Sequence, residues 1–283
     1  MKLFLCAFFL FVSNHLYSKE AGTTLDFLGV VSQAKTSGLS ETGVAIPSDL
    51  RTVDFNPAGI AELKSSNISF SYNKLLMDVN FGEFLWNRKN FGCDFKYLTT
   101  EDNYRNREGI VGGEFRNEMF SGAIIYAKKI KNFSCGIELK GFNEKLEKES
   151  RANFTFSLGS IYYPEIRFPL FLGVSLKDLG PKTGFSDEKD MPPTEIRTGL
   201  YTRISGLDLS GDFVYFFYSN ILSKNLGIEI EPVKGFFVRM GTRNFDTFSG
   251  GIGFNFENIK VDYAFVPYKD LGGTNNFSIM VSF

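Results

Sequence analysis

Hydrophobic side chains recur at every second position in many separate stretches of this chain, and this alternation is the strongest constraint on its fold. At the carboxyl end, apolar residues occupy positions 277, 279, 281 and 283, and Asn, Ser and Met fill the positions between them. Similar alternation appears in residues 151–159, 224–231, 250–256 and 259–265. Because successive side chains of a β-strand point to opposite faces, each stretch predicts a strand with one apolar and one small or polar face.

About fourteen such strands can be placed along the chain. They lie near residues 67–73, 77–86, 90–99, 117–128, 133–143, 151–163, 166–176, 194–204, 207–218, 224–231, 236–243, 248–256, 259–267 and 274–283. Many are about ten residues long, which is the length of a tilted strand that crosses a bilayer. A soluble sandwich alternates in the same way with its apolar face inward, so alternation alone leaves both architectures open.

The connections between the strands favour the membrane architecture, because short and long ones alternate. WNRKN, KKIKN, YPEIRFP, SGLD, EPVKG and ENIK are tight, whereas residues 98–118, 143–151 and 177–195 form longer joins. Outer-membrane barrels have short turns on the periplasmic side and longer loops outside. The sequence therefore predicts an all-β fold: an antiparallel transmembrane β-barrel of about fourteen strands, spanning residues 67–283.

The amino terminus has the plan of a secretory signal. Lys2 is followed by an apolar run at 3–12 and a more polar exit at 13–18. This run is too short for a permanent membrane helix, so we expect residues 1–18 to be a signal peptide that is cleaved before Lys19. Export followed by barrel formation predicts a location in the bacterial outer membrane, in contact with its lipid.

Composition excludes several classes of function. The net charge is −1, without a basic block that could follow a phosphate backbone, so nucleic acid is not an expected partner. The one histidine, His15, lies in the predicted signal, which leaves the mature chain without an imidazole base or metal ligand. Cys93 and Cys135 lack the spacing of a metal or redox centre and fall on strands too far apart for a disulfide, so we expect two free thiols. We expect no enzymatic activity, metal or cofactor.

A barrel of fourteen strands encloses a wide lumen. With strands about 4.8 Å apart and tilted by about 40°, its radius is roughly 14 Å, more than side chains alone can fill. Such a barrel needs a plug or holds water. Residues 19–66 precede the first strand and are the natural plug segment. The corner DFNPAGIAEL at 54–63 lies in it, where Asn-Pro restricts the backbone and Gly59 allows a close turn.

Two segments carry a resemblance to a known family. DFNPAGIAEL resembles the NPAG segment of the FadL superfamily of outer-membrane channels, and the ending VDYAFVPYKDLGGTNNFSIMVSF looks like that of the PorV/PorQ-like branch and of related spirochaete proteins. The resemblance implies a fourteen-stranded barrel with an amino-terminal hatch, to whose motif Asn56, Pro57 and Ala58 correspond, with Gly59 beside them. It also implies passage of hydrophobic molecules past the hatch and through a lateral opening in the wall.

The polar faces of the strands supply candidate lumen residues. If the apolar faces meet lipid, the lumen side holds both signs of charge, from Glu138, Lys140, Arg197, Arg203, Glu229, Glu231, Arg239, Arg243, Lys260 and Asp262. Paired wall residues that bond the hatch explain this mixture as well as substrate contacts do. Trp86, Tyr162 and Tyr163, near short turns, suit an interfacial aromatic girdle.

The sequence thus predicts an outer-membrane channel for passive transport of small hydrophobic molecules such as long-chain fatty acids. The alternative is a PorV-like protein that does not transport but binds secretion-system or surface partners; a porin that conducts salt is a third. The terminal aromatic Phe283 resembles the signal that the barrel-assembly machinery reads, and it is also the last lipid-facing residue of its strand.

Overall fold

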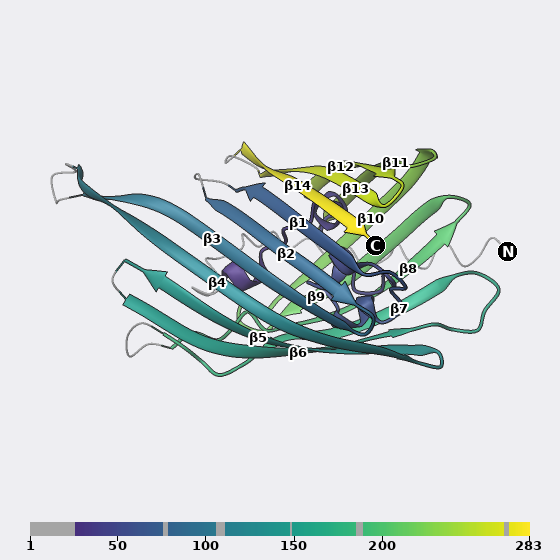
Figure 1. Cartoon of the computed structure of the whole chain (residues 1–283), viewed down its shortest axis with the longest axis horizontal. Coiled ribbons are helices and arrows are strands. Elements are labelled where there is room, and N and C mark those ends of the chain that lie inside the picture. Colours follow the sequence, from purple (N-terminus) through teal and green to yellow (C-terminus); the bar gives the residue numbers. More distant parts are fainter. Residues whose placement is uncertain (1–25, 76–78, 106–110, 148, 185–188, 269–271) are drawn as a thin grey trace.

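The strands of a computed structural model, which describes residues 26–75, 79–105, 111–147, 149–184, 189–268 and 272–283, close into one barrel (Figure 1). Each strand pairs antiparallel with its neighbours in the chain, and β1 closes the barrel by pairing with β14. The predicted fold class is therefore confirmed. The predicted signal peptide, residues 1–18, lies outside the described residues. Among those residues, no helix is both long and apolar enough to cross a bilayer.

The wall consists of fourteen strands, all at places where alternation predicts one. They are β1 (Asn67–Lys74), β2 (Asn80–Arg88), β3 (Phe91–Arg105), β4 (Val111–Ile130), β5 (Phe133–Leu146), β6 (Glu149–Tyr162), β7 (Leu170–Leu179), β8 (Glu195–Ile204), β9 (Leu207–Phe216), β10 (Ile221–Val233), β11 (Phe236–Arg243), β12 (Thr247–Phe256), β13 (Ile259–Tyr268) and β14 (Gly272–Ser282).

Two of the three predicted long joins are mostly strand, which corrects the sequence expectation. β3 and β4 stay paired as far as Tyr104 and Gly113, and β5 and β6 pair up to Leu146 and Glu149. These extensions carry polar side chains on exposed positions, such as Glu101 and Arg116, which form an ion pair of 2.7 Å across the strands. Because these extensions have no apolar face, their sequences show no alternation of apolar and polar residues, and the sequence predicts loops there. Only the join between β7 and β8 is largely irregular.

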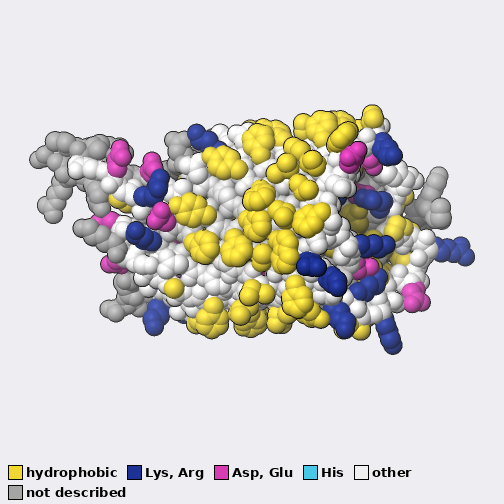
Figure 2. Space-filling model, viewed as in Figure 1, with side chains coloured by type: hydrophobic (Ala, Val, Ile, Leu, Met, Phe, Trp, Pro, Cys, Tyr) yellow, Lys and Arg dark blue, Asp and Glu magenta, His cyan; other side chains and the backbone are white. Residues whose placement is uncertain are grey.

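The outer face of the barrel is an apolar band between two charged rims (Figure 2). Exposed aromatic and aliphatic side chains occupy alternate positions, as Phe154, Phe156 and Leu158 do on β6. Cys93 and Cys135 are both free, as the strand spacing predicts. One girdle residue differs from expectation: Tyr163 turns inward, because its hydroxyl bonds with that of Ser134, 2.9 Å away.

Residues 26–66 fill the lumen and form the plug. It contains the short helices η1 (Asp26–Gly29), α1 (Ala34–Gly38), η2 (Leu50–Thr52) and η3 (Pro57–Ile60), seen inside the barrel in Figure 1. Three apolar clusters join the plug to the wall, and the plug contributes Phe27, Leu39 and Leu50 to them, one to each. Most of the plug backbone is irregular, so it depends on wall side chains and on close packing to remain ordered.

Glycines on the inner face of the wall allow the plug backbone to come this close. We define the glycine belt as Gly136, Gly159, Gly173, Gly199, Gly227, Gly241 and Gly251. Several are cross-strand partners, for example Gly136 with Gly159 and Gly173 with Gly199. A Cβ atom added at Gly136 would lie 2.5 Å from the backbone nitrogen of Ala58, and one at Gly159 would overlap the side chain of Asn56. The belt is therefore the seat of the plug.

Replacing Gly136 by Val is expected to lift the η3 corner from its seat and raise ion conductance in planar bilayers, because overpacking a close contact costs roughly 1–3 kcal/mol or more. Gly141→Val is the matched control, since Gly141 is on the same strand but a Cβ there would meet no atom within 4 Å. Equal, low conductance of the two variants would show that the belt does not seat the plug.

Candidate functional site: the plug and the lumen wall

The Asn-Pro-Ala-Gly corner connects the plug to the wall. The side chain of Asn56 caps η3 by accepting a hydrogen bond from the Ala58 N–H at 3.0 Å. Its amide nitrogen donates to the carbonyl of Val44 within the plug, at 2.7 Å, and to that of Ser160 on β6, at 3.1 Å. Pro57 occupies the first turn of η3, where its lack of an N–H costs nothing. One side chain thus fixes the corner and joins it to a strand.

A buried network of alternating charges binds the plug to β10, β11 and β13. From the plug, Lys35 pairs with Asp49 at 2.9 Å and Arg51 reaches Asp262 on β13 at 2.5 Å. On the wall, Arg239 pairs with both Asp262 and Glu229. Opposite charges are in contact throughout, so the desolvation of each group is offset by a partner, and we name these six residues the charge anchor.

A second contact lies on the opposite wall, at β2 and β3. The ammonium group of Lys96 lies 2.5 Å from Asp54 of the plug, 3.4 Å from Glu83 and 4.0 Å from Asp94. These three carboxylates are close enough together to share an ion, but the lysine occupies that place. The group is therefore a contact between plug and wall in which three carboxylates share one ammonium.

A third contact forms at β8 and β9. Asp212 accepts hydrogen bonds from the backbone N–H groups of Gly43 and Val44, at 2.9 and 3.1 Å. Arg197 donates to the carbonyl of Glu41 at 2.8 Å and lies over the ring of Phe55, 4.4 Å from its centroid. Asp212 does not stand out in the sequence, because its strand shows ordinary alternation, and the plug residues of the charge anchor lie in a segment without a repeating pattern.

The ten candidate lumen residues fall into three groups. Six are buried: Glu138, Lys140, Arg197, Glu229, Arg239 and Asp262. Arg243, which pairs with Glu41 of the plug, and Lys260 are half-buried. Arg203 and Glu231 are exposed instead of enclosed, because both lie beside the tight turns that end their strands. Arg203 pairs there with Asp208, and Glu231 accepts a hydrogen bond from the Gly235 N–H.

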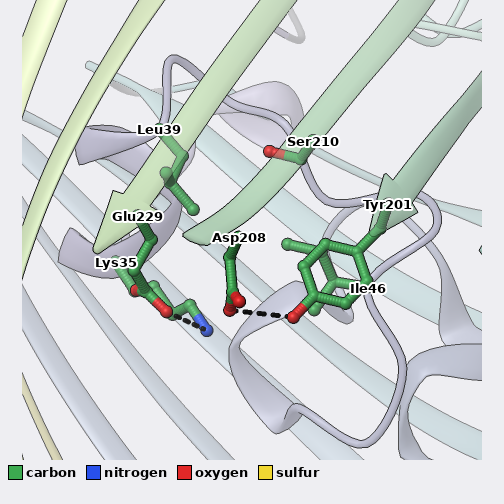
Figure 3. Close-up of a pocket in the computed structure, with 7 residues that line it drawn as sticks. All are labelled: Lys35, Leu39, Ile46, Tyr201, Asp208, Ser210 and Glu229. Carbon is green, nitrogen blue, oxygen red and sulfur yellow. Dashed lines mark hydrogen bonds and ion pairs between the residues drawn. The ribbon is translucent and has the colours of Figure 1, made fainter. Parts of the chain in front are cut away.

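The pocket between the plug and strands β8 to β10 is small and polar (Figure 3). Lys35 faces Glu229 across it, and the Tyr201 hydroxyl donates to Asp208 at 2.8 Å. Its volume of about 10 Å³ is about what one water molecule needs. A hydrocarbon does not fit here, so the plug as it stands closes this side of the lumen.

The wall itself has a discontinuity between β12 and β13. Their ladder runs from Phe256 and Ile259 to Gly250 and Phe265, and beyond it the remaining strand residues pair only with β11 and β14. Pro267, which has no N–H to donate, lies in the unpaired part. An apolar groove with a volume of about 470 Å³ opens at this point, lined by Phe248, Gly250, Ile252, Tyr263, Phe265 and Pro267 among others.

The plug lies directly behind this groove. A Cβ atom at Gly38, the last residue of α1, would lie 3.2 Å from the Cα atom of Gly251 on β12. Ser249, at the point where β12 leaves β13, donates to the Gly38 carbonyl at 3.1 Å and accepts from the Ser40 N–H at 3.0 Å. One layer of backbone therefore separates the groove from the plug.

At the end of the chain, Ser66 and Phe283 exchange two backbone hydrogen bonds, of 3.1 and 2.9 Å. The ring of Phe283 is exposed beside the apolar band. This placement does not test its role in assembly, which stays a prediction.

Solved structures with this architecture exist. No protein-family model and no curated protein matches the chain. The CymD monoaromatic hydrocarbon channel has a TM-score of 0.64 at 11% identity, covering 92% of this chain and 98% of that one. A Pseudomonas aeruginosa FadL homologue has a TM-score of 0.59 at 10% identity, covering 89% and 98%. The Ralstonia pickettii toluene transporter TbuX has a TM-score of 0.59 at 11% identity, covering 88% and 97%.

The chain has the fold of FadL-type outer-membrane barrels. At these identities the likeness concerns the fold alone. The likeness to the PorV/PorQ branch and to spirochaete proteins rests on the sequence resemblance only.

Replacing Arg51 by Met is expected to loosen the charge anchor, because Asp49 and Asp262 would stay buried without their shared partner. Breaking a buried pair costs about 3–5 kcal/mol, so amide exchange of residues 49–60 should accelerate by roughly a hundredfold or more. Arg203→Met is the control, since Arg203 is exposed and pairs with Asp208 of the wall instead of with the plug. Equal exchange in the two variants would rule out the anchor.

The anchor should also survive mild acid. Burial favours a higher pKa for Asp49, but the Arg51 guanidinium and the Lys35 ammonium together hold it well below its ordinary value. A carboxyl whose pKa is lower in the folded than in the unfolded protein stabilises the folded state at any pH above its pKa in the unfolded protein. This stabilisation is lost only as the pH falls through the lower pKa of the folded state. Exchange at Leu50–Thr52, corrected for its intrinsic pH dependence, should thus stay slow from pH 7 to about pH 4. Asp49→Asn should exchange fast throughout; wild-type release above pH 4.5 would contradict the account.

Proposed function

We propose that this protein is an outer-membrane channel for the passive passage of small hydrophobic molecules, and that residues 26–66 are its gate. Two proteins of the same fold are described as a monoaromatic hydrocarbon channel and a toluene transporter, which supports the class of permeant. The observation that carries the proposal is the apolar groove at the β12–β13 discontinuity, with the plug directly behind it.

For a hydrophobic molecule, the route past the charge anchor is unfavourable and the route through the apolar groove is favourable. Crossing it along the plug on the β10, β11 and β13 side means passing the charge anchor, where an apolar molecule would separate paired groups without replacing their hydrogen bonds. The groove offers an apolar surface that is continuous with the membrane-facing band. A hydrophobic molecule that enters from the loop side therefore leaves most easily sideways, once α1 moves away from Gly251.

The loop-side end of the lumen supplies an apolar entrance. Phe81, Leu98 and Phe142 form a cluster on the inner faces of β2, β3 and β5, close to the ends from which the longer connections leave. Phe27 and Leu28 of the plug pack into it. We propose that permeants are received at this cluster.

The remaining parts of the proposal follow from the sequence. Export through a cleaved signal at residues 1–18 and insertion by the barrel-assembly machinery, with Phe283 as part of the signal, would bring the chain to the outer membrane.

A role in binding secretion or surface partners is the second candidate, and the closed lumen is the observation that favours it. Uptake of a hydrophobic probe separates the two: a partner-binding protein would co-purify with its partner and give no flux.

Filling the groove tests the channel directly. Gly250 faces outward, and a Cβ there would meet only the Arg239 carbonyl, 3.9 Å away, so Gly250→Trp should fold and place an indole in the groove. Uptake of labelled toluene by cells that express the variant should fall severalfold, because the indole occupies the exit. Gly141→Trp is the control, an outward-facing glycine on β5 with open space around it. If wild type and both variants take up toluene no faster than cells without the protein, the channel function fails.

A further inference from the structure

Four inward-facing polar side chains on the seam between β1 and β14 have unused hydrogen-bonding groups. They form two cross-strand pairs, Ser71 with Ser278 and Asn73 with Asn276. All four are buried, and Asn73 is fully so. Among the residues that the structure describes, neither the nitrogen nor the oxygen of the Asn73 amide has a hydrogen-bond partner, and the same holds for the Asn276 oxygen and both hydroxyls. Buried polar groups are almost always paired, so such a set points to a ligand.

These groups border the apolar cluster at the loop-side end. Asn73 pairs across the strands with Phe81, and Phe81 pairs with Leu98. Neighbouring inward side chains therefore form one row across the strands. Its β14 and β1 members can form hydrogen bonds, and its β2 and β3 members are apolar. Phe27 of the plug lies against the apolar part, edge-on to Phe142 with ring centroids 6.1 Å apart.

The side chain of Phe27 indicates the size of the molecule that fits. It is a benzyl group, equal to toluene in its heavy atoms, and it is enclosed by the cluster. An apolar cavity left by such a side chain stays dry and accepts a small aromatic molecule. When Phe27 moves away, the cluster can therefore hold one aromatic ring.

The charges nearby determine which polar group the ligand can carry. Ser71 pairs across the strands with Glu83, which shares the ammonium of Lys96 with Asp54 and Asp94. The one ammonium nearby is thus already shared by three carboxylates, and an anionic ligand at the seam would be buried without a cationic partner. Hydroxyl and amide groups such as those of Ser71 and Asn73 suit a neutral partner that both donates and accepts.

We infer that the β1–β14 seam and the Phe81 cluster form one binding site for a small aromatic or similarly sized hydrophobic molecule with a neutral hydrogen-bonding group, such as a phenol or an alcohol. The inference rests on the proposed channel function and narrows its permeant. Toluene would use only the apolar part of the site, whereas a phenol would also satisfy Asn73 and Asn276. A carboxylate of the same shape is excluded by charge.

The test uses three ligands of matched shape: toluene, 4-methylphenol and 4-methylbenzoate. Their affinities are measured at pH 7 by calorimetry on the full chain in lipid nanodiscs, with empty nanodiscs subtracted. Phe27→Ala vacates the apolar part, so binding does not depend on plug movement. In this variant 4-methylphenol should bind about tenfold more tightly than toluene, the effect of one net hydrogen bond, and 4-methylbenzoate more weakly than both.

Adding Asn73→Leu and Asn276→Leu to Phe27→Ala should abolish the preference for the phenol while toluene still binds. The matched control adds Asn275→Leu, since Asn275 neighbours Asn276 on β14 but bonds to the Tyr263 hydroxyl instead of to the lumen. The inference is overturned if toluene and 4-methylphenol bind alike before the seam is changed, or if 4-methylbenzoate binds best; the channel function would survive both results. Absence of binding by all three ligands, together with absence of toluene uptake in cells, would overturn both.

Discussion

The close contact between plug backbone and wall glycines is the constraint on which the rest of the molecule depends. A barrel of fourteen strands is too wide for its own side chains to fill, and the plug is mostly irregular backbone whose polar groups need partners. Glycine at belt positions such as Gly136 and Gly227 lets that backbone touch the strands, so wall side chains between the glycines can reach its N–H and C=O groups. Asp212 and Ser249 serve the plug in this way.

The same arrangement explains why the lumen is so strongly charged. Packing a plug against a polar wall removes water from both, and the buried ions that result are tolerable only when they are paired. The anchor built from Lys35, Arg51 and Asp262 meets this condition, whereas three carboxylates share the single ammonium of Lys96. The two sides of the plug are therefore held differently. The side with paired charges resists separation, and the Lys96 side adjoins the cluster where Phe27 packs.

Much of the fold could be predicted from the sequence, because every strand that meets lipid alternates apolar and polar residues. This alternation is missing beyond the lipid, where the outer parts of β3 and β4 have two polar faces. The sequence therefore predicts a loop there, and the structure has paired strands. The site was harder to predict. Strand parity predicts charged residues such as Glu229 and Asp262 in the lumen, but their partners Lys35 and Arg51 come from the plug, where no period links sequence to position. The paired glycines are a sequence signal for the surface on which the plug packs, since they alternate with lipid-facing residues on neighbouring strands.

The wall discontinuity lies where the glycine belt, the end of the β12–β13 ladder and the contact with α1 meet. A glycine run, Gly250 and Gly251, thins the wall, and the ladder between β12 and β13 stops at the same level. Ser249 holds the end of α1 there with three hydrogen bonds, which are weaker than the ion pairs of the anchor a few residues away in the plug. A small movement confined to Gly38–Ser40 would break these hydrogen bonds and leave the ion pairs of Asp49 and Arg51 in place. Such a movement would open the thinnest part of the wall without releasing the plug, and it would keep the rest of the lumen closed to ions.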